Sequence, residues 1–130
     1  MKYFVCLLAL VLSGCGIFQP LDKDGMIYED RTLITLEQAK EKMAEDGAVI
    51  IDARTQEEYD EGHIPGAIAI PVGTIGTVRP EQLPDLDAVI LIYCKEGRCA
   101  SEAASRLIDL GYMHVYNFGG IEDWDGEIVK

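Results

Sequence analysis

The chain has 130 residues, which allows one ordinary domain with a short appendage but not two domains that each bury a core. It carries 23 acidic and 11 basic residues, so its formal net charge at pH 7 is −12. Because a strongly acidic surface repels phosphate backbones, nucleic acid is excluded as an expected partner. Any anion that the protein handles must therefore be held by a local positive site.

The first fourteen residues predict an export signal. Lys2 supplies a positive start, residues 4–12 form an unbroken apolar run, and Ser13-Gly14 provide small residues before a cleavage point. The run is too short to span a bilayer as a stable helix, which needs about 20 apolar residues. Removal of residues 1–14 would take away one base and no acid, so the mature chain would be still more acidic.

The tetrapeptide Leu12-Ser13-Gly14-Cys15 resembles the bacterial lipobox, in which a lipid is attached to the cysteine thiol and the chain is cut just before it. The resemblance implies an exported protein, lipid-anchored through Cys15 to the bacterial cell envelope on its periplasmic or extracellular face. The alternative is an ordinary signal peptide in which Cys15 is incidental. Residues 15–30 are then a lipidated N-terminus and tether, and residues 31–130 are the domain.

Strand and helix signals alternate through the domain. Two capping boxes, Thr35–Gln38 and Thr55–Glu58, predict helices that end near Asp46-Gly47 and at Gly62. Strands are expected at residues 49–51, 67–70, 89–93 and 114–117. Residues 72–87 are expected to form a loop with one helical turn around residues 81–83, and Gly119-Gly120 are expected to open a last short helix.

The most apolar stretch of the domain, residues 89–93, predicts the central strand of a mostly parallel sheet flanked by helices, an α/β fold. Cys94 follows it directly. Apolar residues then recur at helical spacing until Gly111: Ala100, Ala103, Ala104, Leu107 and Ile108. In open α/β sheets, ligands bind where the carboxyl ends of strands lead into helix N-termini, and Cys94 occupies that place.

Two interpretations of Cys94 follow from its position. Helix amides favour a thiolate, so Cys94 should ionise more easily than a free cysteine with its pKa of about 8.5, while Lys95 and Arg98 supply a local anion site and Gly97 permits close backbone approach. Alternatively, Cys94 is a small buried residue at a strand end, and the two cations are solvated loop charges. Spacing alone does not choose between them.

Four motifs in order resemble the rhodanese family from about residue 32 to residue 124. They are Asp52-Ala53-Arg54 with Glu58-Tyr59, Gly62-His63-Ile64-Pro65-Gly66-Ala67 with Pro71, Tyr93-Cys94 to Gly97-Arg98, and Gly119-Gly120-Ile121 with Trp124. The order Gly97-Arg98 is most similar to the small, single-domain exported rhodaneses of the phage-shock type.

The resemblance implies a rhodanese-like fold and a thiosulfate sulfurtransferase. The Cys94 thiolate would take a sulfane sulfur from an anionic donor such as thiosulfate and pass it to a thiophilic acceptor such as cyanide, a thiol or a protein. The substrate-binding loop would be Lys95, Glu96, Gly97, Arg98 and Cys99, with Asp52 and Arg54 behind it; neither a metal nor an organic cofactor is implied. The alternative is a persulfide carrier, redox sensor or partner-binding lipoprotein without turnover.

Cys99 stands where other rhodanese loops place an arginine. It is either a resolving thiol that attacks a Cys94 persulfide and closes a disulfide, or a packing residue. Phosphatases of the same fold need an arginine six places after the cysteine, where this chain has Ala100, so phosphoryl transfer is disfavoured. Cys94, Cys99, His63 and His114 match no common zinc spacing.

Overall fold

Capping boxes start the first two helices of the computed structural model, which describes residues 32–45 and 47–130. Helix α2 (Leu36–Met43) begins after Thr35, whose hydroxyl accepts a hydrogen bond from the Gln38 amide while the Gln38 side chain accepts one from the Thr35 amide. Helix α3 (Gln56–Glu61) begins with the same reciprocal pair, Thr55 and Glu58. Both helix starts are therefore confirmed.

The end of α2 differs from the prediction. The helix finishes at Met43, whereas the sequence predicted an end near Asp46-Gly47. The amide of Ala44 divides its hydrogen bond between the carbonyls of Lys40 and Glu41, and the amide of Glu45 bonds three residues back. The last turn thus tightens and stops the helix before Gly47, a left-handed glycine with φ of 86°.

Four parallel strands form one sheet in the order β2-β1-β3-β4. Their bounds are β1 Val49–Asp52, β2 Ile68–Ala69, β3 Val89–Cys94 and β4 His114–Gly120. Strand β3 has a neighbour on each side, and its last five residues are buried, so the predicted central strand is confirmed. The expected parallel α/β fold is therefore the fold that the chain adopts.

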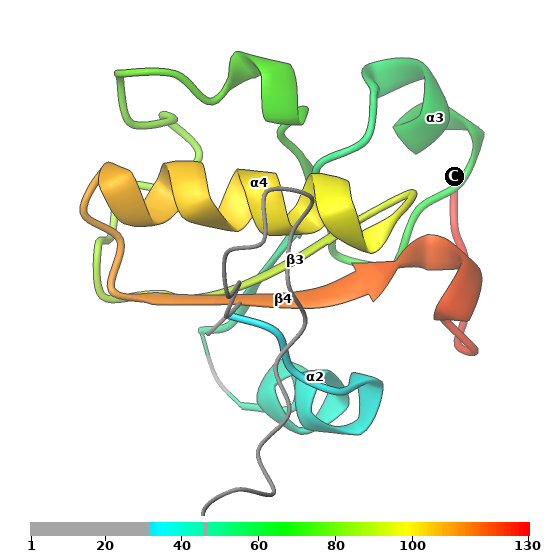
Figure 1. Ribbon diagram of the computed structural model, residues 1–130. Helices are drawn as coiled ribbons and strands as arrows, with labels where there is room; N and C mark the ends of the chain where they lie inside the picture. Colours follow the sequence, from blue (N-terminus) through cyan, green and yellow to red (C-terminus); the bar gives the residue numbers. More distant parts are fainter. Residues whose placement is uncertain (1–31, 46) are drawn as a thin grey trace, which may run out of the picture. The chain divides into compact units, whose positions relative to one another are not determined.

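Helices cover both faces of the sheet. Figure 1 shows α4 (Gly97–Asp109) along one face and α2 on the other. The buried small residues of α4 pack in one cluster with alternate residues of β1 and β3. The helix residues are Ala100, Ala103 and Ala104, and the strand residues are Ile51, Ile90 and Ile92. On the face of α2, Ala39 packs with Leu91, Tyr93 and Phe118. Burial on both faces explains why β3 is an unbroken apolar run.

The two short helical turns that the sequence predicted have different outcomes. The short helix expected after Gly119-Gly120 forms as a 3-10 turn, Ile121–Asp123; the two glycines end β4, and Gly120 is also the N-cap of the turn. At residues 81–83 the chain makes a single hydrogen-bonded turn, in which the Leu83 amide donates to the Pro80 carbonyl, and not a helix. A 3-10 turn that the sequence did not predict forms at Val72–Thr74. There, the carbonyl of Pro71 accepts hydrogen bonds from both the amide and the hydroxyl of Thr74, which fixes the turn.

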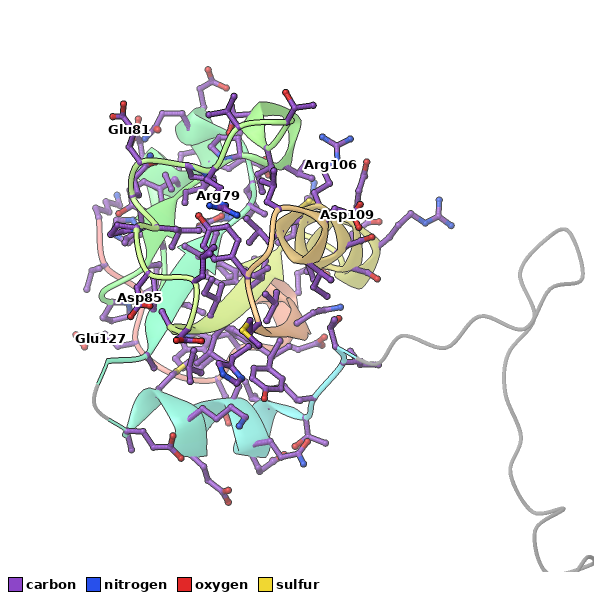
Figure 2. All side chains as sticks on the ribbon, turned by 90° about the vertical axis from the view of Figure 1, so that its left-hand side faces the viewer. Arg79, Glu81, Asp85, Arg106, Asp109 and Glu127 are labelled. Atoms are coloured by element: carbon purple, nitrogen blue, oxygen red, sulfur yellow. A yellow bond between two sulfur atoms is a disulfide. The ribbon has the colours of Figure 1, made fainter. Side chains whose placement is uncertain are left out.

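The long segment between this turn and β3 is held at the end of the domain where α4 finishes. Figure 2 shows Arg79, Glu81 and Asp85 on this segment, and Arg106 and Asp109 on α4. The Arg79 guanidinium donates to the Leu110 carbonyl at 2.8 Å, and the Tyr112 hydroxyl donates to the Leu83 carbonyl at 2.6 Å. These contacts fasten the segment to the end of α4.

Residues Thr32–Lys130 form one compact unit. In the described part of the chain, no helix is long and apolar enough to cross a membrane. The predicted signal sequence, Cys15 and the whole of the predicted tether lie outside the described residues, and the anchor stays a prediction.

Candidate active site

Cys94 is the last residue of β3 and is buried, with 3% of its surface exposed. It lies opposite Gly120 of β4, after an irregularity in the register that begins at Ile92. Helix α4 starts at Gly97, so only two residues separate the strand from the helix. Cys94 therefore lies where the carboxyl end of a central strand meets a helix N-terminus.

The connection into α4 carries the positive groups. Lys95 and Arg98 have exposed side chains, and within residues 32–45 and 47–130 neither forms a salt bridge. Glu96 is the N-cap of α4, and its side chain makes no capping hydrogen bond. The first amides of a helix have no acceptor within it and carry the positive end of the helix dipole. Amides and cations together can hold an anion beside Cys94.

Cys99, in the first turn of α4, is disulfide-bonded to Cys94. The two Cα atoms are 5.7 Å apart, within the usual range for a disulfide. The Cys99 Sγ also lies 3.7 Å from the carbonyl oxygen of Ala53, so it is directed toward the end of β1. A disulfide sulfur is not a thiolate, so Cys94 becomes a nucleophile only after this bond is reduced.

Gly120 positions the loop from the neighbouring strand, a role that sequence reasoning missed. A Cβ atom at Gly120 would lie 2.4 Å from the Lys95 carbonyl oxygen, a distance that Cβ atoms do not show. The absence of a side chain thus lets β4 approach the residue that follows Cys94. The signal was the pair Gly119-Gly120 itself, which indicated the start of the last helical turn but not the close approach to Lys95.

Asp52 and Arg54 form a buried ion pair behind the site. The Asp52 carboxylate is fully buried, and it accepts hydrogen bonds from Arg54 Nε at 3.0 Å and Nη2 at 2.7 Å. Arg54 also donates to the Gly62 carbonyl at 2.6 Å. The pair thus ties the end of β1 to the end of α3.

Tyr93 links this ion pair to β3, a role that the motif containing it did not indicate. Its hydroxyl donates to Asp52 Oδ2 at 2.6 Å and accepts from the Ile64 amide at 3.1 Å. Burial, and then the hydrogen bond to Asp52, raise the pKa of the Tyr93 phenol well above its usual value. The hydrogen bond to Asp52 likewise raises the pKa of Arg54. The network therefore fixes the residue adjacent to Cys94 in a protonated, donating state.

His63 and Trp124 have structural contacts. The His63 ring stacks on Tyr59 with 3.8 Å between centroids, and its Nδ1 lies 2.9 Å from the Tyr59 carbonyl oxygen. Trp124 packs against the cluster that contains Phe118, and its Nε1 donates to the Glu127 carbonyl. None of these contacts involves Cys94.

A hollow of about 470 Å³ beside β2 carries no ionisable group. Its lining residues are Gln56, Ala69, Ile70, Pro71, Thr74, Pro80 and Gln82. Among the residues that the structure describes, no three His, Cys, Asp or Glu side chains gather as a metal site would require. Cys94 and its loop therefore remain the candidate site of the described domain.

Comparison with known proteins identifies relatives. The family model described as rhodanese-like domain matches residues 35–127. The chain is 37% identical over 73 residues to the thiosulfate sulfurtransferase PspE of Escherichia coli strain K12, a match that covers 56% of this chain and 70% of that protein.

Solved structures with a similar fold belong to rhodaneses and sulfurtransferases. A rhodanese with anions from E. coli superposes with a TM-score of 0.59 at 35% identity, covering 64% of this chain and 98% of that one. A human single-domain sulfurtransferase superposes with a TM-score of 0.60 at 26% identity, covering 68% of this chain and 89% of that one. The predicted rhodanese-like α/β fold is confirmed.

Proposed function

The chain belongs to the rhodanese-like family, and on this premise we propose that it is a sulfurtransferase that carries sulfane sulfur on Cys94. The donor is an anion such as thiosulfate, and the acceptor is cyanide or a thiol. The observation that carries the proposal is the position of Cys94 at the carboxyl end of β3, with the N-terminus of α4 and the two loop cations beside it.

In the reduced protein, the Cys94 thiolate attacks the outer sulfur of thiosulfate. The bond between the two sulfur atoms of the donor breaks, sulfite leaves, and Cys94 keeps a persulfide. Lys95 and Arg98 attract the donor and offset the negative charge of sulfite, while the amides at the start of α4 stabilise the anionic persulfide. A thiophilic acceptor then removes the outer sulfur and restores the thiolate.

The relatives support this choice of substrate class. PspE is named a thiosulfate sulfurtransferase, and the related E. coli rhodanese structure was solved with anions. A small sulfur-containing anion also suits an acidic chain whose exposed loop cations lie beside its reactive cysteine. Passage of the sulfur to a protein thiol would use the same persulfide.

We place this activity at the bacterial cell envelope, with the domain held to the membrane by a lipid on Cys15. The support is the lipobox-like Leu12-Ser13-Gly14-Cys15 after an apolar run. The domain itself would remain in water, since the acyl chains alone enter the bilayer.

Replacing Cys94 by serine tests the assignment of the nucleophile. The purified protein is reduced, freed of reductant and given thiosulfate and cyanide, and thiocyanate is measured. We expect the Cys94→Ser variant to lose at least about 10³-fold of the transfer rate, because a neutral hydroxyl replaces the thiolate. Ser105→Ala, on the exposed side of α4, is the matched control and should keep the wild-type rate. A serine variant that still forms thiocyanate contradicts the proposal.

A further inference from the structure

We propose that Cys99 discharges the Cys94 persulfide inside the protein, releasing hydrosulfide and closing the Cys94–Cys99 disulfide. The protein would then have a second activity, reduction of thiosulfate to sulfite and hydrosulfide at the expense of a dithiol. This inference rests on the proposed function, because it needs the persulfide on Cys94.

The geometry brings the two sulfur atoms together without a change of fold. Cys94 ends β3, Cys99 is in the first turn of α4, and their Cα atoms are 5.7 Å apart while both elements keep their regular structure. The sulfur of Cys99 can therefore reach the inner sulfur of a Cys94 persulfide. A nucleophile held at this distance reacts far faster than one that must arrive from solution.

The position of Cys99 also distinguishes it from its neighbours in the loop. Gly97 and Arg98 are exposed, whereas Cys99 is half-buried and its sulfur lies 3.7 Å from the Ala53 carbonyl oxygen. Ala53 directly follows β1, the strand that neighbours β3 in the sheet. Cys99 thus contributes its sulfur to the site from α4, whereas Cys94 contributes its sulfur from the end of β3.

The step balances with the groups that are present. The Cys99 sulfur bonds to the Cys94 sulfur, the bond from Cys94 to the outer sulfur breaks, and the outer sulfur leaves as hydrosulfide with the Cys99 proton. In this step the outer sulfur is reduced to sulfide and the Cys99 sulfur is oxidised, while the Cys94 sulfur, already oxidised in the persulfide, keeps its oxidation state in the disulfide. An external dithiol then reduces the disulfide by thiol exchange and is itself oxidised to a cyclic disulfide.

A single-turnover experiment on the full chain tests the step. Reduced protein, freed of reductant and kept without oxygen, receives one equivalent of thiosulfate and no cyanide; hydrosulfide and intact mass are then measured. We expect the wild type to release close to one hydrosulfide per protein and to end two hydrogens lighter than the dithiol. Cys99→Ser and Cys99→Ala should release at most about one tenth as much hydrosulfide and should retain one added sulfur. Ser105→Ala should behave as the wild type.

The possible failures are distinguishable. If the wild type keeps the added sulfur and releases no hydrosulfide, the role of Cys99 is overturned, while cyanide should still discharge that sulfur as thiocyanate and uphold the sulfurtransferase. Equal hydrosulfide release from wild type and both Cys99 variants also overturns it, because another group would then be the acceptor. If no protein gains sulfur or forms thiocyanate, the proposed function itself fails, and this inference fails with it.

Discussion

The hydroxyl of Tyr93 is where three segments of the domain meet. It donates to Asp52 at the end of β1 and accepts from the amide of Ile64, and Tyr93 is itself the residue before Cys94. Removing this single oxygen atom would leave a buried amide without its acceptor and a buried carboxylate with one donor fewer. The position of Cys94 therefore depends on the polar contacts of its neighbour Tyr93 as well as on apolar packing.

We expect Tyr93→Phe to lower the free energy of unfolding by about 1–3 kcal/mol, the usual cost of leaving a buried polar group unsatisfied. Denaturant unfolding of the oxidised protein measures it. The matched control is Tyr116→Phe, because the ring of Tyr116 keeps its contact with Lys42, whose Nζ lies 4.4 Å from the ring centroid. That control should change stability by less than about 0.5 kcal/mol. Equal losses of unfolding free energy in the two variants would contradict a specific structural role for the Tyr93 hydroxyl.

The same pair of proteins should show a pH dependence with a definite sign. Burial raises the pKa of Tyr93 in the folded state above its unfolded value of about 10. Its contribution to stability is therefore complete below about pH 10 and is lost as the pH rises through the folded-state pKa. The difference in unfolding free energy between wild type and Tyr93→Phe should shrink above pH 10, and a constant difference would contradict this assignment.

Sequence reasoning could locate Cys94 but could not find the partner of Tyr93. The place of Cys94 follows from local signals, an apolar strand followed by a small-residue helix. The contacts of Tyr93 join residues 41 and 29 positions away in the chain, and no local pattern encodes them. For Cys99, the sequence left packing and a resolving thiol open, because the two alternatives differ in the direction of one side chain.

At the scale of elements, the close approach of β4 to the active-site loop decides where the loop lies. Gly120 faces the Lys95 carbonyl so closely that a methyl group there would lie 2.4 Å from the oxygen. Backbone atoms rather than a flexible side chain fill this space, so the clash can be relieved only by moving the strand or the loop.

We expect Gly120→Ala to slow thiocyanate formation by about tenfold to a hundredfold, because a displacement near 1 Å in the site misplaces the anion-binding groups. The initial rate of thiocyanate formation by the reduced protein measures this. Gly73→Ala is the control, since a Cβ atom at Gly73 meets nothing within 4 Å. Its rate should match the wild type. An unchanged rate in Gly120→Ala would show that the loop adapts and that its position is not set by β4.

Starts of elements were predictable here and ends were less so. The capping boxes at Thr35 and Thr55 are local hydrogen-bonding patterns, and both form as read. The end of α2 depends on a tightened last turn, and the length of β4 depends on pairing between Gly120 and Cys94. Such boundaries are set by neighbours in space, so the pattern at Gly119-Gly120 indicated the short helical turn that follows but not that both glycines also extend β4.

For the molecule as a whole, the net charge bears on how the protein could be held at a membrane. The formal net charge is −12, yet the loop beside Cys94 carries two exposed cations. An acidic domain gains nothing from an anionic membrane surface through its own charge, so attachment to an envelope requires another source of affinity. A lipid on Cys15 would supply it, because each buried CH₂ group contributes about 0.8 kcal/mol and several acyl chains on one cysteine add together.

We therefore expect the full chain, expressed in a bacterium that processes lipoproteins, to incorporate labelled fatty acid and to sediment with membranes. Cys15→Ser should abolish the label and shift most of the protein to the soluble fraction, because no other residue of the lipobox bears a thiol. Cys6→Ser, within the apolar run that the cut removes, is the matched control and should keep both label and membrane association. Label that persists in Cys15→Ser would show that the lipid is carried by another residue. Label that is absent from the wild type would show that the apolar run directs ordinary export and that the domain is not lipid-anchored.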